Sequence, residues 1–139
     1  MSARLVVDNS VVMTWCFEDE VSAYCEGVLD ALNEGAALVP SIWPLEVVNV
    51  LLVAERKKRL SPQASARFLS LLRSLPIIVE QETTRAVFQE VLLIARQGGL
   101  SSYDASYLQL ALMSGQPIAT VDKAMKRAAK LLKVSLFSI

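Results

Sequence analysis

Histidine is absent from this chain of 139 residues. Its absence excludes Ser-His-Asp and Cys-His catalysis, imidazole general bases and histidine-rich zinc sites. Only two cysteines are present, Cys16 and Cys25, and their spacing matches neither a CxxC redox pair nor a zinc-ligand pattern. We therefore assign the cysteines no function. Hard oxygen ligands remain for any metal site, and these favour Mg²⁺ or Mn²⁺.

Long apolar runs are also missing, although hydrophobic residues make up 53% of the chain. No run approaches the roughly 20 residues of a membrane-spanning helix, and no signal-peptide pattern precedes the first apolar strand. We therefore expect a cytoplasmic protein without membrane contacts. The apolar surplus predicts a homodimer and an additional groove for a partner, with Trp15, Phe17 and Trp43 as interface candidates. The alternative is that both Trp side chains are core residues.

Basic residues are scarce in the first 50 positions, where eight acids accompany one base. Positions 51–139 hold six acids and thirteen bases. This split permits a basic surface beside an acidic site, which suits a metal nuclease because cations bind phosphates. The alternative is that the basic clusters are solvated helix faces. The candidate RNA-binding residues are Arg56, Lys57, Lys58, Arg59, Lys123, Lys126 and Arg127.

Short, continuously apolar runs alternate with helical patterns along the whole chain. The runs, at residues 5–7, 37–39, 77–79, 118–121 and 135–137, are typical of strands buried on both faces of a parallel sheet. Helical patterns cover about 21–32, 42–58, 62–73, 84–98, 102–114 and 122–133. The alternation predicts one α/β domain over residues 1–139, with a mainly parallel sheet of four to five strands.

Four acidic residues lie at the ends of apolar strands or inside apolar helices: Asp8, Glu46, Asp104 and Asp122. Burying an unpaired carboxylate costs several kcal/mol, so a metal ion is the common reason for such acids. Helix capping is an alternative for each Asp, and a solvent-facing stripe is the alternative for Glu46. Asn49, one turn after Glu46, shares its helix face and is a supporting candidate. Capping does not explain the joint pattern, which predicts a divalent-metal site.

Four segments, in order and spacing, resemble the motifs of PIN-domain ribonucleases, and specifically of VapC-type toxins of toxin–antitoxin pairs. They are residues 6–11 (VVDNSV), 44–51 (PLEVVNVL), 102–111 (SYDASYLQLA) and 120–123 (TVDK). The resemblance implies an α/β/α sandwich, divalent-metal-dependent RNA cleavage and inhibition by a small VapB-type antitoxin. It places metal-site acids at Asp8, Glu46, Asp104 and Asp122, with Ser10 and Thr120 as supporting hydroxyls.

The chemistry that follows is hydrolysis of an RNA phosphodiester by a metal-activated water. Four converging carboxylates repel one another without metal, so at least one should have a raised pKa. One alternative is a catalytically silent PIN-like binding module, which would have lost one of the acids, and none is missing. Another is an aspartyl phosphatase or phosphotransferase, which needs a second Asp two positions after Asp8, where this chain has Ser10. A mononucleotide-binding domain is disfavoured, because no glycine phosphate loop follows the first strand.

Overall fold

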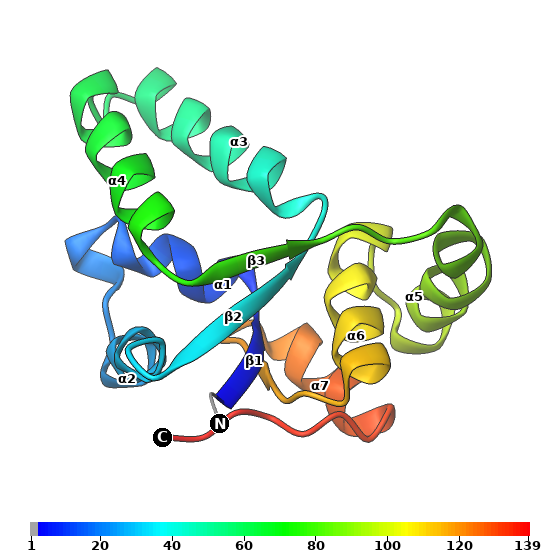
Figure 1. The fold of residues 1–139 in the computed structure, drawn as a ribbon. Helices are drawn as coiled ribbons and strands as arrows, with labels where there is room; N and C mark the ends of the chain where they lie inside the picture. Colours follow the sequence, from blue (N-terminus) through cyan, green and yellow to red (C-terminus); the bar gives the residue numbers. More distant parts are fainter. Residues whose placement is uncertain (1–2) are drawn as a thin grey trace.

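A four-stranded parallel sheet forms the centre of the protein (Figure 1) in a computed structural model that describes residues 3–139. The strand order is β3-β2-β1-β4. The central strand β1 (Ala3–Val7) pairs with β2 (Gly35–Pro40) and with β4 (Ile118–Ala119), and β2 pairs with β3 (Ile77–Glu80). The α/β class and the parallel sheet expected from the apolar runs are confirmed.

The fifth apolar run forms much less sheet than expected. Residues 135–137 contribute one isolated parallel bridge, from Leu136 to Ile118, although Phe137 N–H also donates to the Ile118 carbonyl. The strand expected at 118–121 is also shorter, because β4 ends at Ala119. The next residue, Thr120, turns its hydroxyl to the end of β1. The sheet therefore has four strands and a short extension at its β4 edge.

The helices follow the expected order, with some differences in extent. Their bounds are α1 Asn9–Val12, α2 Ala23–Ala31, α3 Trp43–Arg56, α4 Pro62–Ser74, α5 Leu92–Gly98, α6 Ser102–Ser114 and α7 Lys123–Leu131. Short 3-10 helices occupy η1 Met13–Trp15 and η2 Glu18–Glu20, and a π-helix, η3 Ala86–Val91, leads into α5. Local signals explain several ends: Ser61 and Ser101 cap α4 and α6, while Gly99 and Gly115 end α5 and α6 in left-handed conformations.

Helices cover both faces of the sheet, as expected for a three-layer α/β/α sandwich. In Figure 1, α5, α6 and α7 lie on one side of the sheet and α1 to α4 on the other. Helix α6 contacts β1, β2 and β4 on one side and α5 and η3 on the other. Every residue from Ala105 to Ala111 is consequently buried. A helix buried on all sides holds its side chains in fixed places, which matters for the site described below.

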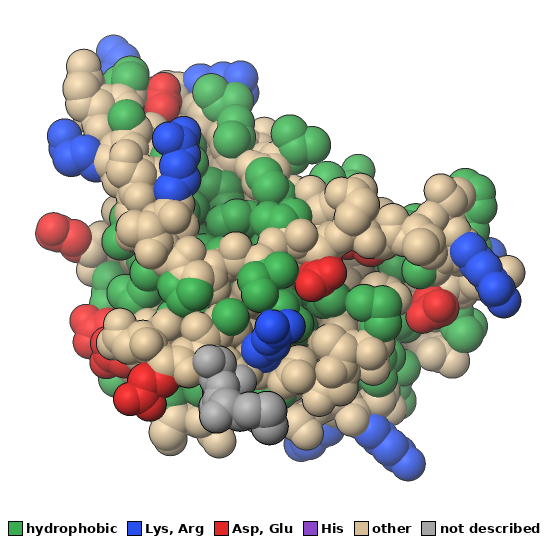
Figure 2. Space-filling view, viewed as in Figure 1, with side chains coloured by type: hydrophobic (Ala, Val, Ile, Leu, Met, Phe, Trp, Pro, Cys, Tyr) green, Lys and Arg blue, Asp and Glu red, His purple; other side chains and the backbone are tan. Residues whose placement is uncertain are grey.

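The aromatic residues proposed for an interface belong largely to the core. Phe17 and Trp43 are buried, which agrees with the core alternative for Trp43, although the Trp43 side chain also lines the cleft between α3 and α4. Trp15 is half-buried, and its indole N–H donates to the Cys25 carbonyl. The prominent exposed apolar side chains are instead Phe88 and Leu45, at 70% and 67% exposure. Figure 2 shows further apolar side chains in the hollow between α3 and α4. No helix within residues 3–139 has the length and apolar character needed to cross a membrane.

Candidate active site

All four acids line one open cavity of about 650 Å³ at the carboxyl ends of the parallel strands. Asp8 directly follows β1, and Asp122 comes three residues after β4. Glu46 lies in the first turn of α3, and Asp104 lies in the first turn of α6. Ligand sites of open parallel sheets form at this edge, because loops and helix ends converge there. The sheet thus brings together four carboxylates that are spread over most of the sequence.

Asp8 is buried, and its carboxylate is oriented by two hydroxyl groups. Ser10 Oγ donates to Asp8 Oδ2 at 2.7 Å, and Thr120 Oγ1 donates to the same oxygen at 2.8 Å. Both hydroxyls also accept backbone N–H groups, from Val121 to Ser10 at 3.2 Å and from Asp122 to Thr120 at 3.1 Å. These bonds commit one oxygen of Asp8, and within residues 3–139 no hydrogen bond is made to Oδ1. Ser10 and Thr120, the two supporting hydroxyls that the resemblance implies, therefore both hold the Asp8 carboxylate.

Helix capping explains one of the three aspartates and not the other two. Asp8 precedes α1, but its side chain makes no capping hydrogen bond. Asp104 N–H is capped by Ser101 Oγ at 3.1 Å, and the Asp104 carboxylate makes no hydrogen bond to another described residue. Asp122 is a true cap, because its Oδ1 accepts from Ala124 N–H at 2.8 Å and from Met125 N–H at 3.2 Å. Capping thus accounts for one oxygen of Asp122 and leaves the other free.

Three of the four carboxyl groups have raised pKa values, as expected for acids that crowd one cavity. Burial is the main cause for Asp8, and the carboxylates of Asp104 and Asp122 raise its pKa further, against the opposing effect of the two hydroxyls. Burial also raises the pKa of Glu46, with smaller contributions from Asp8 and Asp104. The pKa of Asp104 is raised by burial and by Asp122. The cavity therefore disfavours negative charge until a cation compensates it.

The donor set of the cavity suits a hard divalent cation. No three His, Cys, Asp or Glu side chains of residues 3–139 form a ready-made metal-binding group. The carboxylates line an open cavity, where mutual repulsion opposes closer approach. Mg²⁺ usually keeps several waters and takes only one or two direct carboxylate ligands, so it does not require three side chains at one point. Carboxylate oxygens beside two hydroxyls are the ligand types that Mg²⁺ and Mn²⁺ prefer.

Tyr107 is a site residue that the sequence reasoning missed. Its hydroxyl donates to Glu46 Oε1 at 2.7 Å, although the two residues are 61 positions apart. Burial and the adjacent Glu46 carboxylate raise the pKa of Tyr107, so the phenol stays protonated as a donor. The available signal was a hydroxyl group within the apolar helix, one turn after Asp104. The supporting candidate Asn49, by contrast, lines a neighbouring apolar groove with Tyr103 and not the acidic cavity.

The basic candidates fall into two groups at different distances from the cavity. Lys123, Lys126 and Arg127 are exposed on the first turns of α7, directly after Asp122. Arg56, Lys57 and Lys58 are exposed at the far end of α3, about 15 Å along the helix from Glu46 at 1.5 Å per residue.

Arg59 has partners within the chain. Its guanidinium pairs with Asp19 at 2.9 Å and with Glu20 at 2.6 Å, and it lies over the Phe17 ring at 4.0 Å. Glu20 is a further acid that lines the cavity. Arg59 therefore partly compensates the negative charge on that wall.

The parallel α/β/α sandwich, with four acids around one cavity beyond its strand ends, can be compared with known families. Residues 5–131 match the PIN domain, so the chain belongs to the PIN-domain family, whose members are typically nucleases. No protein of curated function is significantly similar in sequence. Among solved structures, the chain is similar to that of PAE2754 from Pyrobaculum aerophilum, with 26% identity and a TM-score of 0.69. That match covers 92% of this chain and 87% of the other.

Proposed function

We propose that the protein is a divalent-metal-dependent endoribonuclease that acts as the toxin of a type II toxin–antitoxin pair. The observation that carries the proposal is the placement of Asp8, Glu46, Asp104 and Asp122 around one cavity at the sheet edge. PIN domains are nuclease-type proteins that generally use divalent metals, which supports this chemistry. The VapC-type motifs of the sequence support RNA as substrate and an antitoxin as partner.

The contacts of Asp8 and Asp122 define the task of each in this proposal. Bound Mg²⁺ or Mn²⁺ would supply an activated water and stabilise the charge that develops on the leaving oxygen. Ser10 and Thr120 hold Asp8 so that its uncommitted oxygen remains available. Asp122 is held by the first N–H groups of α7, whose positive end lessens the repulsion between carboxylates. The exposed cations of α7 lie next to Asp122 and suit the phosphates of a bound strand.

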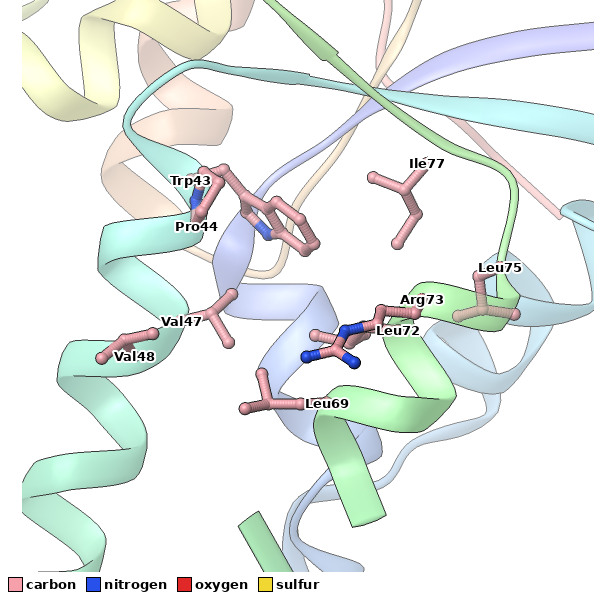
Figure 3. Close-up of a pocket in the computed structure, with 9 residues that line it drawn as sticks. All are labelled: Trp43, Pro44, Val47, Val48, Leu69, Leu72, Arg73, Leu75 and Ile77. Atoms are coloured by element: carbon pink, nitrogen blue, oxygen red, sulfur yellow. The ribbon is translucent and has the colours of Figure 1, made fainter. Parts of the chain in front are cut away.

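The surface of the protein supports two kinds of partner. Negative charge in the cavity is complementary to an Arg or Lys of an antitoxin, which would compete with metal and block substrate phosphates. A cleft of about 260 Å³ between α3 and α4 offers apolar contacts for the same partner. Its walls include Trp43, Val47 and Leu72, and Figure 3 shows Arg73 extending from α4 toward the cleft.

Exposed apolar side chains that line one groove, Leu45, Val48 and Leu52, support a homodimer. Sedimentation at tens of micromolar tests this point, and a clean monomer would refute it. A toxin of this kind would act in the cytoplasm, where its RNA targets are.

The proposal is tested by incubating total RNA with the purified protein in Mg²⁺, in Mn²⁺ and in EDTA, and then mapping the new ends. We expect cleavage that requires the metal and is lost in Asp8→Asn. Asp30→Asn, which removes an exposed acid at the end of α2, is the matched control and should cleave normally. Full activity of a verified Asp8→Asn preparation would overturn the assignment. RNA binding without any cleavage would favour the silent binding module.

A further inference from the structure

We propose that Tyr107 is a positioning residue that holds Glu46 at the acidic cavity and thereby sets the affinity of the site for its cation. The inference rests on the proposed function, because it concerns the same metal site. It adds a residue that is not a metal ligand and that acts only through Glu46. The hydrogen bond from Tyr107 Oη to Glu46 Oε1, at 2.7 Å, is the contact that carries it.

Without that bond, the Glu46 side chain could point into either of two neighbouring cavities. Its side chain lines the acidic cavity and also the neighbouring groove, of about 490 Å³, that includes Leu45, Leu52 and Tyr103. Glutamate has a flexible side chain, and Asp8 and Asp104 repel its carboxylate from the acidic side. Electrostatics before metal binding therefore favour the position away from the cluster, and a specific contact is needed to oppose this.

Tyr107 supplies this contact from a fixed position in the core. Its exposure is 0%, and it lies in the fully buried stretch of α6 between the sheet and the outer helices. Close packing fixes the ring, so the phenol oxygen has one defined position behind the Glu46 carboxylate, which itself lines the cavity. The donor lies on α6, which also carries Asp104, while the acceptor lies on α3. The bond therefore sets the position of Glu46 relative to Asp104.

The same arrangement recurs at two other acids of the cavity. Ser10 and Thr120 occupy Oδ2 of Asp8, and the N–H groups of Ala124 and Met125 occupy Oδ1 of Asp122. Together with Tyr107 at Glu46 Oε1, three carboxylates each have one oxygen committed to the protein. Single-oxygen ligands suit Mg²⁺ and Mn²⁺, whereas Ca²⁺ readily takes both oxygens of a carboxylate. Tyr107 should thus also favour the smaller ions over Ca²⁺.

The test is Mn²⁺ and Ca²⁺ binding to Tyr107→Phe, measured by titration calorimetry at fixed pH. Phenylalanine keeps the buried ring and removes only the hydroxyl. Loss of a group that orients a ligand typically weakens metal binding by about 10–100-fold, so we expect Mn²⁺ affinity to fall about tenfold or more and the preference over Ca²⁺ to shrink. Ser114→Ala is the control, because the Ser114 hydroxyl lies at the other end of α6 and donates to the Leu110 carbonyl at 2.6 Å. It should bind Mn²⁺ as the wild type does.

A double-mutant cycle separates positioning from a general loss of structure. In a Glu46→Gln background, Tyr107→Phe should change Mn²⁺ affinity little, because its target carboxylate is gone. An equal loss in both backgrounds, or wild-type affinity in Tyr107→Phe, would overturn the inference.

The failure of the inference is distinguishable from the failure of the proposed function. If the wild type binds Mn²⁺, Asp8→Asn does not, and Tyr107→Phe matches the wild type, only the role of Tyr107 is wrong. If the wild type itself binds no Mn²⁺, the proposed function and the inference fall together.

Discussion

Asp8→Asn should stabilise the protein when no metal is bound, although we expect it to abolish the proposed activity. Asparagine has nearly the same shape as aspartate and carries no charge. Its carbonyl oxygen can still accept the hydroxyls of Ser10 and Thr120, which bond to Oδ2 of the native carboxylate. The substitution therefore removes the buried charge while it keeps the hydrogen-bond pattern around it.

The size of the effect follows from two opposing contributions. Asp8 is only 4% exposed, and removing a carboxylate from water costs several kcal/mol, taken here as roughly 4 kcal/mol. Hydrogen bonds to a neutral acceptor are weaker than those to a charged one by about 1 kcal/mol each, and two hydroxyls are involved. The expected net gain is about 2 kcal/mol in the free energy of unfolding. For a chain of 139 residues, this gain corresponds to a rise in Tm of roughly 6–8 °C.

The gain in stability of Asp8→Asn over the wild type should increase with pH. The pKa of Asp8 is raised in the folded state from its ordinary value of 3.8, mainly by burial. The folded state then binds the proton more tightly than the unfolded state, so wild-type stability falls as pH rises from about 3.8 through the folded pKa. The advantage of Asp8→Asn should be complete above that window. It should vanish below pH 3.8, where Asp8 is protonated in both states.

The assay is thermal and urea unfolding in EDTA, repeated with saturating Mn²⁺. At a concentration 1,000 times Kd, ligand binding stabilises the wild type by about 4 kcal/mol, which should reverse the order of the two proteins. The control Asp30→Asn should change stability by no more than about 0.5 kcal/mol, because Asp30 is exposed. If Asp8→Asn in EDTA were no more stable than the wild type at pH 7, the reading of Asp8 as a penalised buried charge would be wrong.

Three further predictions test the basic residues of α7 and the two ends of α6. Lys126→Gln should reduce the dependence of log affinity on log salt for single-stranded RNA by about 0.7, whereas Lys57→Gln, at the far end of α3, should change it less. Ser101→Ala removes the N-cap that accepts Asp104 N–H at 3.1 Å, and it should cost about 1 kcal/mol in urea unfolding. Gly115→Ala should cost about 1–2 kcal/mol through the backbone alone, because φ is +69° and no atom lies within 4 Å of the added Cβ. Wild-type stability in Gly115→Ala would contradict that conformation.

Local sequence signals determined most of the fold and the identity of the four acids. The apolar run that ends at Asp8 predicted β1, and the helical pattern over residues 102–114 predicted α6. These signals involve only residues that are close together in the sequence, so they can be recognised without the tertiary structure. The shared position of Asp8 and Asp122 also followed, because parallel strands end at one edge.

The interactions that make the acids into a site were decided by tertiary structure. Tyr107 reaches Glu46 across 61 positions, and Thr120 reaches Asp8 across 112. Sequence periodicity says that α6 is apolar, but it does not say which neighbour the phenol of Tyr107 contacts. Arg59 was counted among the RNA-binding candidates, and only the fold shows its partners Asp19 and Glu20.

Tertiary structure also decided which apolar residues are surface and which are core. The sequence left open whether Trp43 is an interface or a core residue, and in the structure both Trp43 and Phe17 are buried. Leu45 and Val48 share an apolar helix with the buried Val47, yet they face outward. An apolar residue can be buried by its own chain or by a partner, and the two cases have the same local composition. The sequence by itself therefore determined most of the elements and singled out four acids that line one cavity. Packing between distant segments decided the orientation and the electrostatics of these acids.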